Sequence, residues 1–163
     1  MEEIFKRRSY HDGFDGTKKI SDDDINAILK AGMNAPSAND TQPWEFVVID
    51  DAKKLQELST LNHWTRAVGT SSHTIIVCMK PDKYAGIDCG IAVQNIVLQS
   101  AHMDIGSLIM GIHENEGYQQ TIKGLLNIPD EYIAYSMIAL GYPSETLPPN
   151  DKFFPNKVHQ NQY

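Results

Sequence analysis

The chain has 163 residues, enough for one domain with a sizeable core but too few for two independent catalytic domains. Its 21 acidic residues outnumber its 14 basic residues, and the net charge of −7 argues against binding to nucleic acid. The two cysteines form no metal-binding or redox motif, and the chain shows neither an apolar signal core nor a membrane-spanning segment, so we expect one cytoplasmic domain, residues 1–163.

The first half of the chain predicts two helices and two strands. Ser21 and Asp51 are candidate N-caps, and each precedes apolar residues at helical spacing. These apolar positions are Ile25, Ile28, Leu29 and Met33 in the first helix and Leu55, Leu58 and Leu61 in the second. The apolar runs 44–50 and 73–80 are rich in β-branched residues and predict two interior strands.

The second half predicts a central helix and a further strand. Residues 88–102 are apolar on most of the helical circumference, which indicates a helix enclosed by other elements. A short apolar run, 106–111, precedes an amphipathic helix around Tyr118 and Ile122, and 132–142 reads as a strand.

The C-terminal segment 143–163 differs in composition from the rest of the chain. It is rich in proline, shows no period and predicts an extended arm. The arm contains the adjacent residues Phe153 and Phe154, whose exposure to water is unfavourable. Two interpretations are open: a frayed tail, or an arm that buries this pair on a neighbouring subunit.

Familiar catalytic motifs are missing from the sequence. There is no nucleophile elbow or zinc-protease helix, and the glycines of 106–111 are followed by Ile112 and His113 where a phosphate loop has lysine and a hydroxyl. The histidines are scattered, which indicates no metal site.

Two segments stand out instead: the loop "APSANDTQP" at 35–43 and the basic cluster Lys6, Arg7 and Arg8. Arginine forks bind phosphate, although a solvated basic terminus is the alternative interpretation.

Four segments together identify a family resemblance. They are "RRSY" from residue 7, "NAPSANDTQPW" from residue 34, "DCGIAVQNIVLQSAHMDIGS" from residue 88 and "ALGYPSETLPPNDKF" from residue 139. Their order and spacing resemble the nitroreductase-like family of FMN flavoproteins over almost the whole chain. The resemblance implies an α+β fold, a central mixed or antiparallel sheet flanked by helices, and an intertwined homodimer with two FMN sites at the subunit interface.

The resemblance also implies roles at the two ends of the cofactor. Arg7, Arg8 and Ser9 match the family's grip on the FMN phosphate and the flavin edge, which agrees with the anion-binding chemistry of an arginine pair. Lys152 matches a phosphate contact in the C-terminal arm.

The resemblance also implies that residues of both subunits contact the flavin ring. Pro36, Ser37 and Ala38 match the loop that lies against the flavin bound mainly by the other subunit. Gly106 and Ser107 match a loop that passes the reactive side of the flavin.

Two positions depart from the family pattern. His11 stands where relatives have a cation near the pyrimidine end of the flavin, and histidine carries charge only part of the time near neutral pH. Arg66 is the alternative source of this charge. Asp40 replaces the usual asparagine and accepts a hydrogen bond but donates one only when protonated.

The function that the resemblance implies is electron transfer from NADH or NADPH to nitroaromatics, quinones or similar small acceptors by a ping-pong mechanism. FMN carries this chemistry, so no catalytic side chain is expected. The alternative hypothesis is a flavin-binding redox sensor or FMN reservoir with little turnover. The sequence does not select the acceptor or the nicotinamide.

Overall fold

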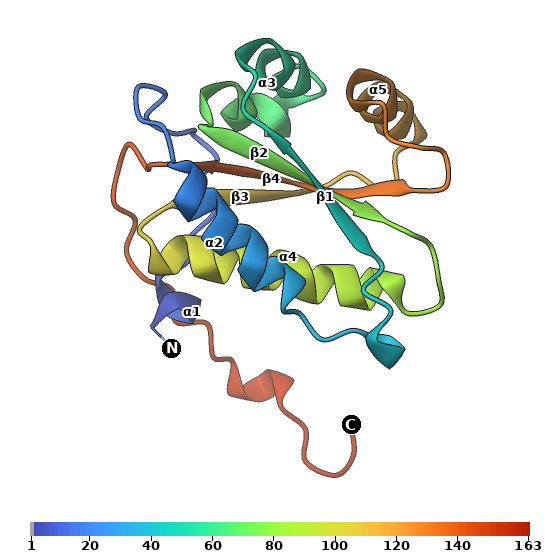
Figure 1. The fold of residues 1–163 in the computed structure, drawn as a ribbon. Helices are drawn as coiled ribbons and strands as arrows, with labels where there is room; N and C mark the ends of the chain where they lie inside the picture. The colour runs from blue at the N-terminus through green and yellow to red at the C-terminus, as the bar shows by residue number, and fades with distance from the viewer. Residues whose placement is uncertain (1) are drawn as a thin grey trace.

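A four-stranded sheet between two layers of helices forms the centre of the protein in the computed structural model, which describes residues 2–163 (Figure 1). The strands lie in the order β1-β2-β4-β3 and every neighbouring pair is antiparallel. Their bounds are Trp44–Ile49 for β1, His73–Met79 for β2, Gly106–Gly111 for β3 and Ile133–Gly141 for β4. The predicted α+β class with a central antiparallel sheet is confirmed.

The helices divide between the two faces of the sheet (Figure 1). One face is covered by α2, Asp22–Met33, and α4, Ala85–His102, with the short α1, Glu3–Lys6, beside them. The other face is covered by α3, Ala52–Ser59, the 3-10 segment η2, His63–Thr70, and α5, Glu116–Leu126. Across residues 2–163, no helix combines the length and apolarity needed to cross a lipid bilayer.

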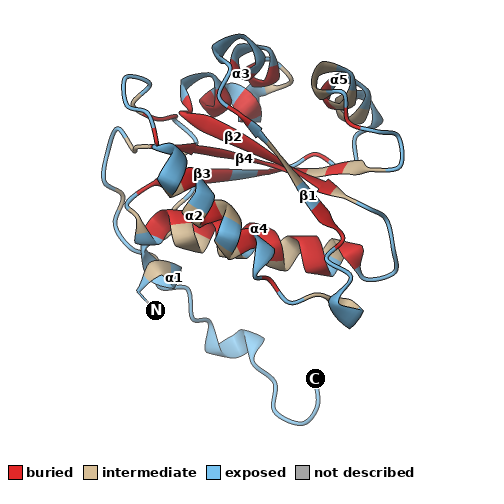
Figure 2. Ribbon diagram, viewed as in Figure 1, coloured by how far each residue is buried: buried red, intermediate tan, exposed pale blue. Residues whose placement is uncertain are grey.

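Two apolar clusters, one on each face of the sheet, form the core, and Figure 2 shows this buried centre. Strand β2 contributes side chains to both clusters, because successive side chains of a strand point to opposite faces. Ile75 and Val77 pack toward α2 and α4, and Ile76 and Cys78 pack toward α3 and α5. The predicted interior position of this strand is therefore confirmed.

The helix starts follow the predicted caps. The Ser21 hydroxyl accepts a hydrogen bond from the Asp24 backbone N–H at 3.2 Å, and the Asp51 carboxylate accepts one from the Lys54 N–H at 2.9 Å. Each cap satisfies a backbone donor that the first helical turn leaves unpaired. Asp82 does the same for Ala85 at 2.7 Å, so α4 begins three residues earlier than predicted.

Strand β1 and helix α2 differ from the sequence-based expectation. Strand β1 is an edge strand with one paired neighbour, and its Val48 is 38% exposed, so the prediction of an interior strand over 44–50 is wrong. Met33, expected on the buried face of α2, is the last residue of the helix and is 54% exposed. Leu61 lies outside α3 but packs against the same apolar cluster.

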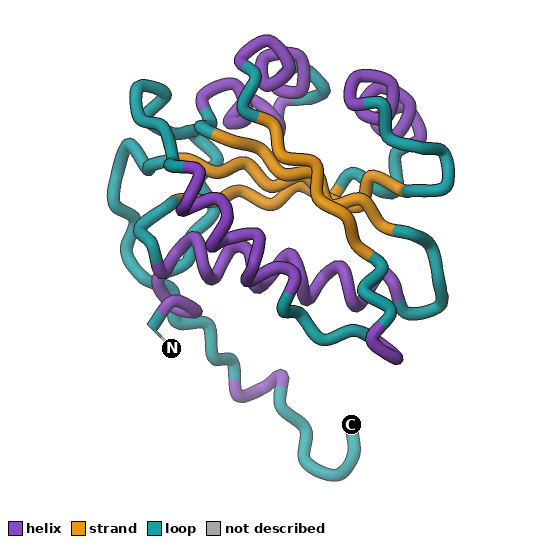
Figure 3. The backbone as a smooth tube through the Cα atoms, viewed as in Figure 1, coloured by secondary structure: helices purple, strands orange, loops and turns teal. Residues whose placement is uncertain are grey.

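The C-terminal arm has two parts. Residues 143–150 run along the N-terminal segment of the same chain: Pro143 forms a β-bridge with Phe14, and the Asn150 N–H donates to the Phe5 carbonyl at 2.9 Å. Residues 151–163 are exposed throughout and contain only the single turn η3, Pro155–Lys157 (Figure 3). Only this second part leaves the body of the molecule.

Candidate active site

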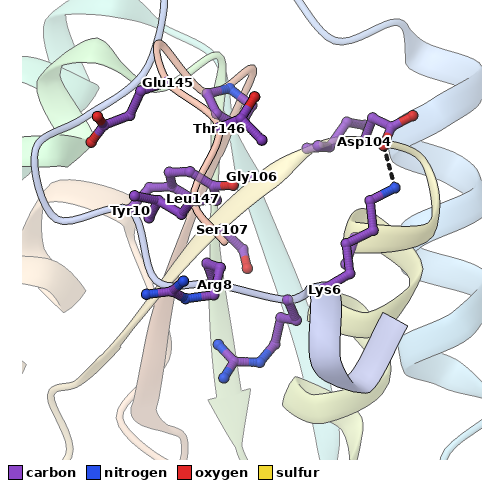
Figure 4. A pocket seen from close by; sticks show the side chains of 13 residues that line it. Lys6, Arg8, Tyr10, Asp104, Gly106, Ser107, Glu145, Thr146 and Leu147 are labelled. Atoms are coloured by element: carbon purple, nitrogen blue, oxygen red, sulfur yellow. Dashed lines mark hydrogen bonds and ion pairs between the residues drawn. The ribbon is translucent and has the colours of Figure 1, made fainter. Parts of the chain in front are cut away.

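The predicted anion-binding residues line a pocket of about 320 Å³ (Figure 4). Its walls come from three parts of the chain that are distant in sequence: the N-terminal segment, the turn from α4 into β3, and the start of the arm. The lining residues that the argument below uses are Lys6, Arg7, Arg8, Tyr10, Asp104, Gly106, Ser107, Pro143 and Glu145. The fold thus brings Arg7 and Arg8 into one pocket with Gly106 and Ser107, which the family resemblance assigns to the same cofactor.

Backbone pairing holds the N-terminal segment against β3. Ser9 and Ser107 form a parallel bridge, and the Tyr10 N–H donates to the Ser107 carbonyl at 3.2 Å. A Cβ atom on Gly106 would lie 2.9 Å from both Pro143 Cγ and Tyr10 Cδ2, so only glycine allows the three segments to meet this closely.

Each cation of the pocket has a partner within the protein. Lys6 donates to the Asp104 carboxylate, which raises the pKa of the lysine, and Arg8 donates to the carbonyl of Pro148 in the arm. Arg7 makes a long contact of 3.5 Å to the Ser9 hydroxyl. The three cationic side chains therefore line one pocket, and an anion that binds there must displace their present partners.

The loop with Pro36, Ser37 and Ala38 lies near the N-terminal end of α4, whereas α1 lies at the C-terminal end of that helix (Figure 1), and the loop lines no part of the pocket. The Ser37 hydroxyl accepts from the Gln42 N–H at 2.9 Å, and the Gln42 side chain donates to Asp40 at 3.0 Å.

The backbone of this loop adopts an unusual conformation. Asn39, Asp40 and Gln42 have positive φ angles of 53°, 56° and 46°, which residues with a Cβ adopt at a cost. Such conformations persist where surrounding contacts impose them, and they concentrate at functional sites. The loop therefore presents a fixed surface.

Asp88 provides one of these contacts and was missed by sequence reasoning. Its side chain, on the first turn of α4, is 5% exposed and accepts a hydrogen bond from the Ala38 N–H at 3.1 Å. The available signal was a carboxylate at the start of an otherwise apolar helix, but its partner lies 50 residues away. Asp88 holds the loop on its own chain.

The two candidate cations for the pyrimidine end of the flavin lie in different pockets. His11 meets the edge of the Trp64 ring, with centroids 6.2 Å apart, in a pocket of about 320 Å³ beside β3. Arg66 lines a separate pocket and donates from Nε to the His63 carbonyl at 3.1 Å. Lys152 lies in the exposed part of the arm and does not line the pocket of Arg7 and Arg8.

The thiols lie in the core, as expected of structural cysteines. Burial raises the pKa of Cys78 to about 11 and that of Cys89 to about 12, which keeps both protonated and unreactive at neutral pH. Among residues 2–163, no group of three or more histidine, cysteine, aspartate or glutamate residues could hold a metal ion.

The protein is thus an α+β protein with helices on both faces of its sheet and a pocket lined by three cationic side chains beside the edge strand β3. A sequence model of the Nitroreductase family matches residues 4–76 and 78–142, and the chain belongs to this family. The resemblance drawn from the motifs is thereby confirmed.

Relatives support this assignment over the whole chain. A protein of Archaeoglobus fulgidus, provisionally named NADH dehydrogenase/NAD(P)H nitroreductase, is 34% identical over 169 residues, covering 98% of this chain and 96% of that protein. The crystal structure of a protein of the same provisional name from Bacteroides thetaiotaomicron superposes with a TM-score of 0.93 at 30% identity, covering 99% of this chain and 96% of the other. An FMN-dependent nitroreductase from Clostridium difficile superposes with a TM-score of 0.90 at 26% identity, covering 99% and 98%.

Proposed function

We propose that this protein is an NAD(P)H-dependent FMN oxidoreductase that passes electrons to a nitroaromatic, a quinone or a similar electron-poor acceptor. The observation that carries the proposal is the pocket in which the basic N-terminal segment meets the start of β3 in a member of the Nitroreductase family. The FMN-dependent nitroreductase of Clostridium difficile, which shares the fold over 99% of this chain, supports the choice of cofactor.

The side chains of the pocket fit the phosphate of FMN. Arg7 and Arg8 carry guanidinium forks, which bind phosphate oxygens through paired hydrogen bonds, and Lys6 adds a third cation. Two carboxylates, Asp104 and Glu145, line the same pocket, so the three cations exceed the anions by one. The balance favours an anionic group without neutralising a phosphate dianion completely.

Within this proposal, different residues of the pocket bind different parts of FMN. Arg7, Arg8 and Ser9 bind the phosphate and the flavin edge, and the backbone of Gly106 and Ser107 borders the reactive side of the ring. Their shared pocket and the pairing of Ser9 with Ser107 support this division.

The remaining contacts belong to the periphery of the proposed site. His11 or Arg66 supplies charge near the pyrimidine end, Asp40 replaces an asparagine in the loop, and Lys152 reaches the phosphate from the arm. All four side chains are exposed and therefore accessible to a cofactor or a second subunit.

We further propose that residues 1–163 form one domain that works as an intertwined homodimer. Pro36, Ser37 and Ala38 would cover the flavin of the partner subunit, because they lie far from the phosphate pocket of their own chain. The arm would pack on the partner from residue 151 onward. Phe153 and Phe154 are 72% and 52% exposed in the single chain, which supports burial on a second copy.

Hydride transfer from a reduced nicotinamide and onward electron transfer to an acceptor are the chemistry that FMN supplies when bound. The protein's own groups bind, orient and shield, so no acid or base side chain is required. One site serving donor and acceptor in turn predicts ping-pong kinetics, with parallel double-reciprocal lines.

The visible spectrum of the purified protein tests this function. We expect yellow protein that releases FMN on denaturation, is bleached by NADH or NADPH without oxygen, and regains its colour quickly when a quinone or nitroaromatic is added. Colourless protein that ignores added FMN would contradict the proposal. Reduction followed by slow recovery would favour a redox sensor or FMN reservoir instead.

A further inference from the structure

We propose that Lys6 is a third cation that binds the cofactor phosphate, and that the Asp104 carboxylate competes with the phosphate for this lysine. The inference rests on the proposed FMN site and adds two residues to it. Lys6 and Asp104 both line the pocket of Arg7 and Arg8, and the lysine ammonium is directed at the carboxylate (Figure 4).

The three cations of the pocket differ in what they must give up to bind phosphate. Arg8 has a neutral carbonyl as its partner and Arg7 a neutral hydroxyl at 3.5 Å, so a phosphate would replace an uncharged acceptor with a charged one. Lys6 already holds a carboxylate and would exchange one anion for another. Of the three cations, the lysine therefore contributes the least binding energy to the phosphate.

The pair is open to solvent, which makes the exchange possible. The side chains of Lys6 and Asp104 are 52% and 78% exposed, and exposed ion pairs contribute little stability because water screens them. A phosphate can displace the carboxylate, but Asp104 then remains beside it as a like charge.

The position of Asp104 is locally unfavourable for an aspartate. Its φ angle is 59°, just beyond Met103, which caps the C-terminal end of α4. Aspartate tolerates this left-handed conformation, as asparagine does, but the carbonyl end of a helix repels its negative charge. The contact with Lys6 is the interaction in the pocket that offsets this repulsion.

The backbone of the turn also keeps Asp104 beside the pocket. The Asp104 N–H donates to the Ala101 carbonyl at 3.3 Å, and the next residue, Ile105, is buried and donates to the Ser100 carbonyl at 2.9 Å. The turn from α4 into β3 is therefore anchored on both sides of Asp104. Its charge stays at the mouth of the pocket whether or not phosphate is bound.

The substitution Asp104→Asn tests the inference, because asparagine keeps the size and suits the backbone but removes the charge. Equilibrium dialysis of the full-length protein should give an FMN dissociation constant about three- to tenfold lower than that of wild type, the range expected for one solvent-screened charge acting on a phosphate. Binding of riboflavin, which has the same ring without the phosphate, should not change. A misfolded variant would bind more weakly, so tighter binding has no trivial explanation.

Asp130→Asn is the matched control. Asp130 is an exposed aspartate that also pairs with a lysine, Lys123, at 3.5 Å, but it lies outside the pocket. The control changes the net charge equally and should leave the affinities for FMN and riboflavin unchanged. An equal decrease of the FMN dissociation constant in both variants would overturn the inference, because net charge alone would then explain the tighter binding.

A second variant pair tests the role of Lys6. Lys6→Met should weaken FMN binding more in the Asp104→Asn background than in wild type, because the lysine is then free to meet the phosphate. If wild type binds FMN and Asp104→Asn binds it no more tightly, the inference is wrong and the proposed function stands. If wild type binds neither FMN nor riboflavin, the proposed function is wrong and the inference with it.

Discussion

The two ends of the proposed flavin site are built in opposite ways. The phosphate pocket collects long side chains from three distant segments; its two arginines have uncharged partners that an anion can replace, while Lys6 is paired with Asp104. The loop 36–42 is instead held by hydrogen bonds of 2.9 and 3.1 Å, one of them to the buried Asp88 carboxylate, and has three residues with positive φ angles. One end adapts to a ligand, while the other presents a preformed surface.

This difference is the one that the proposed site, shared between two subunits, requires. The pocket is open toward solvent, and the loop lies at the other end of α4 and lines no part of it. A second copy, related by a two-fold axis, would bring the rigid loop of each chain to the adaptable pocket of the other. The following predictions test this arrangement, from the largest expected effect to the smallest.

Deleting residues 151–163 should cause the largest change, the joint loss of the dimer and of bound FMN. The fold should survive, because 143–150 remain anchored by the Phe14–Pro143 bridge and the contact of Asn150 with Phe5. Sedimentation velocity with detection of flavin absorbance measures both losses, and circular dichroism controls for folding. A flavin-loaded monomer would refute the shared site.

Arg7→Ala should weaken FMN binding by about ten- to a hundredfold, because a hydrogen bond to a charged group contributes roughly 1.5–3 kcal/mol. Added FMN should largely restore activity, since the loss is one of affinity. Equilibrium dialysis measures the change, with Lys53→Ala on the exposed side of α3 as the control. Unchanged affinity would remove Arg7 from the phosphate site.

Asp88→Ala should lower the free energy of unfolding by about 1–3 kcal/mol, because the Ala38 N–H and its surroundings lose their buried acceptor. Asp88→Asn keeps an acceptor oxygen and should lose less. Urea denaturation gives both values, and the flavin circular dichroism of the dimer reports the loop itself. Equal losses in the two variants would mean that the hydrogen bond does not hold the loop.

His11→Gln should have the smallest effect: FMN stays bound, while the reduction potential or its dependence on pH shifts. The reason is that histidine gains charge as the pH falls and would then favour the reduced, anionic ring. Spectroelectrochemical titration across neutral pH measures the shift. If Arg66→Ala moves the potential and His11→Gln does not, Arg66 is the cation.

Local patterns in the sequence determined the elements of this fold. Ser21 and Asp51 start their helices because a cap needs only a side chain and a backbone N–H three residues on. The alternation along β2 places its side chains on both faces for an equally local reason. The arginine-serine start and the proline-serine loop were sufficient to indicate the family, because their spacing along the chain carries the signal.

Only the tertiary structure decided which residues meet. No local pattern pairs Asp88 with Ala38, 50 positions apart, or Lys6 with Asp104, 98 positions apart, because these contacts depend on how α4 crosses the sheet. The same holds for the exposed edge position of β1, which follows from the strand order, and for the division of the arm at residue 150. Spacing along the chain sets helix and strand, whereas packing between distant segments sets charge partners and exposure.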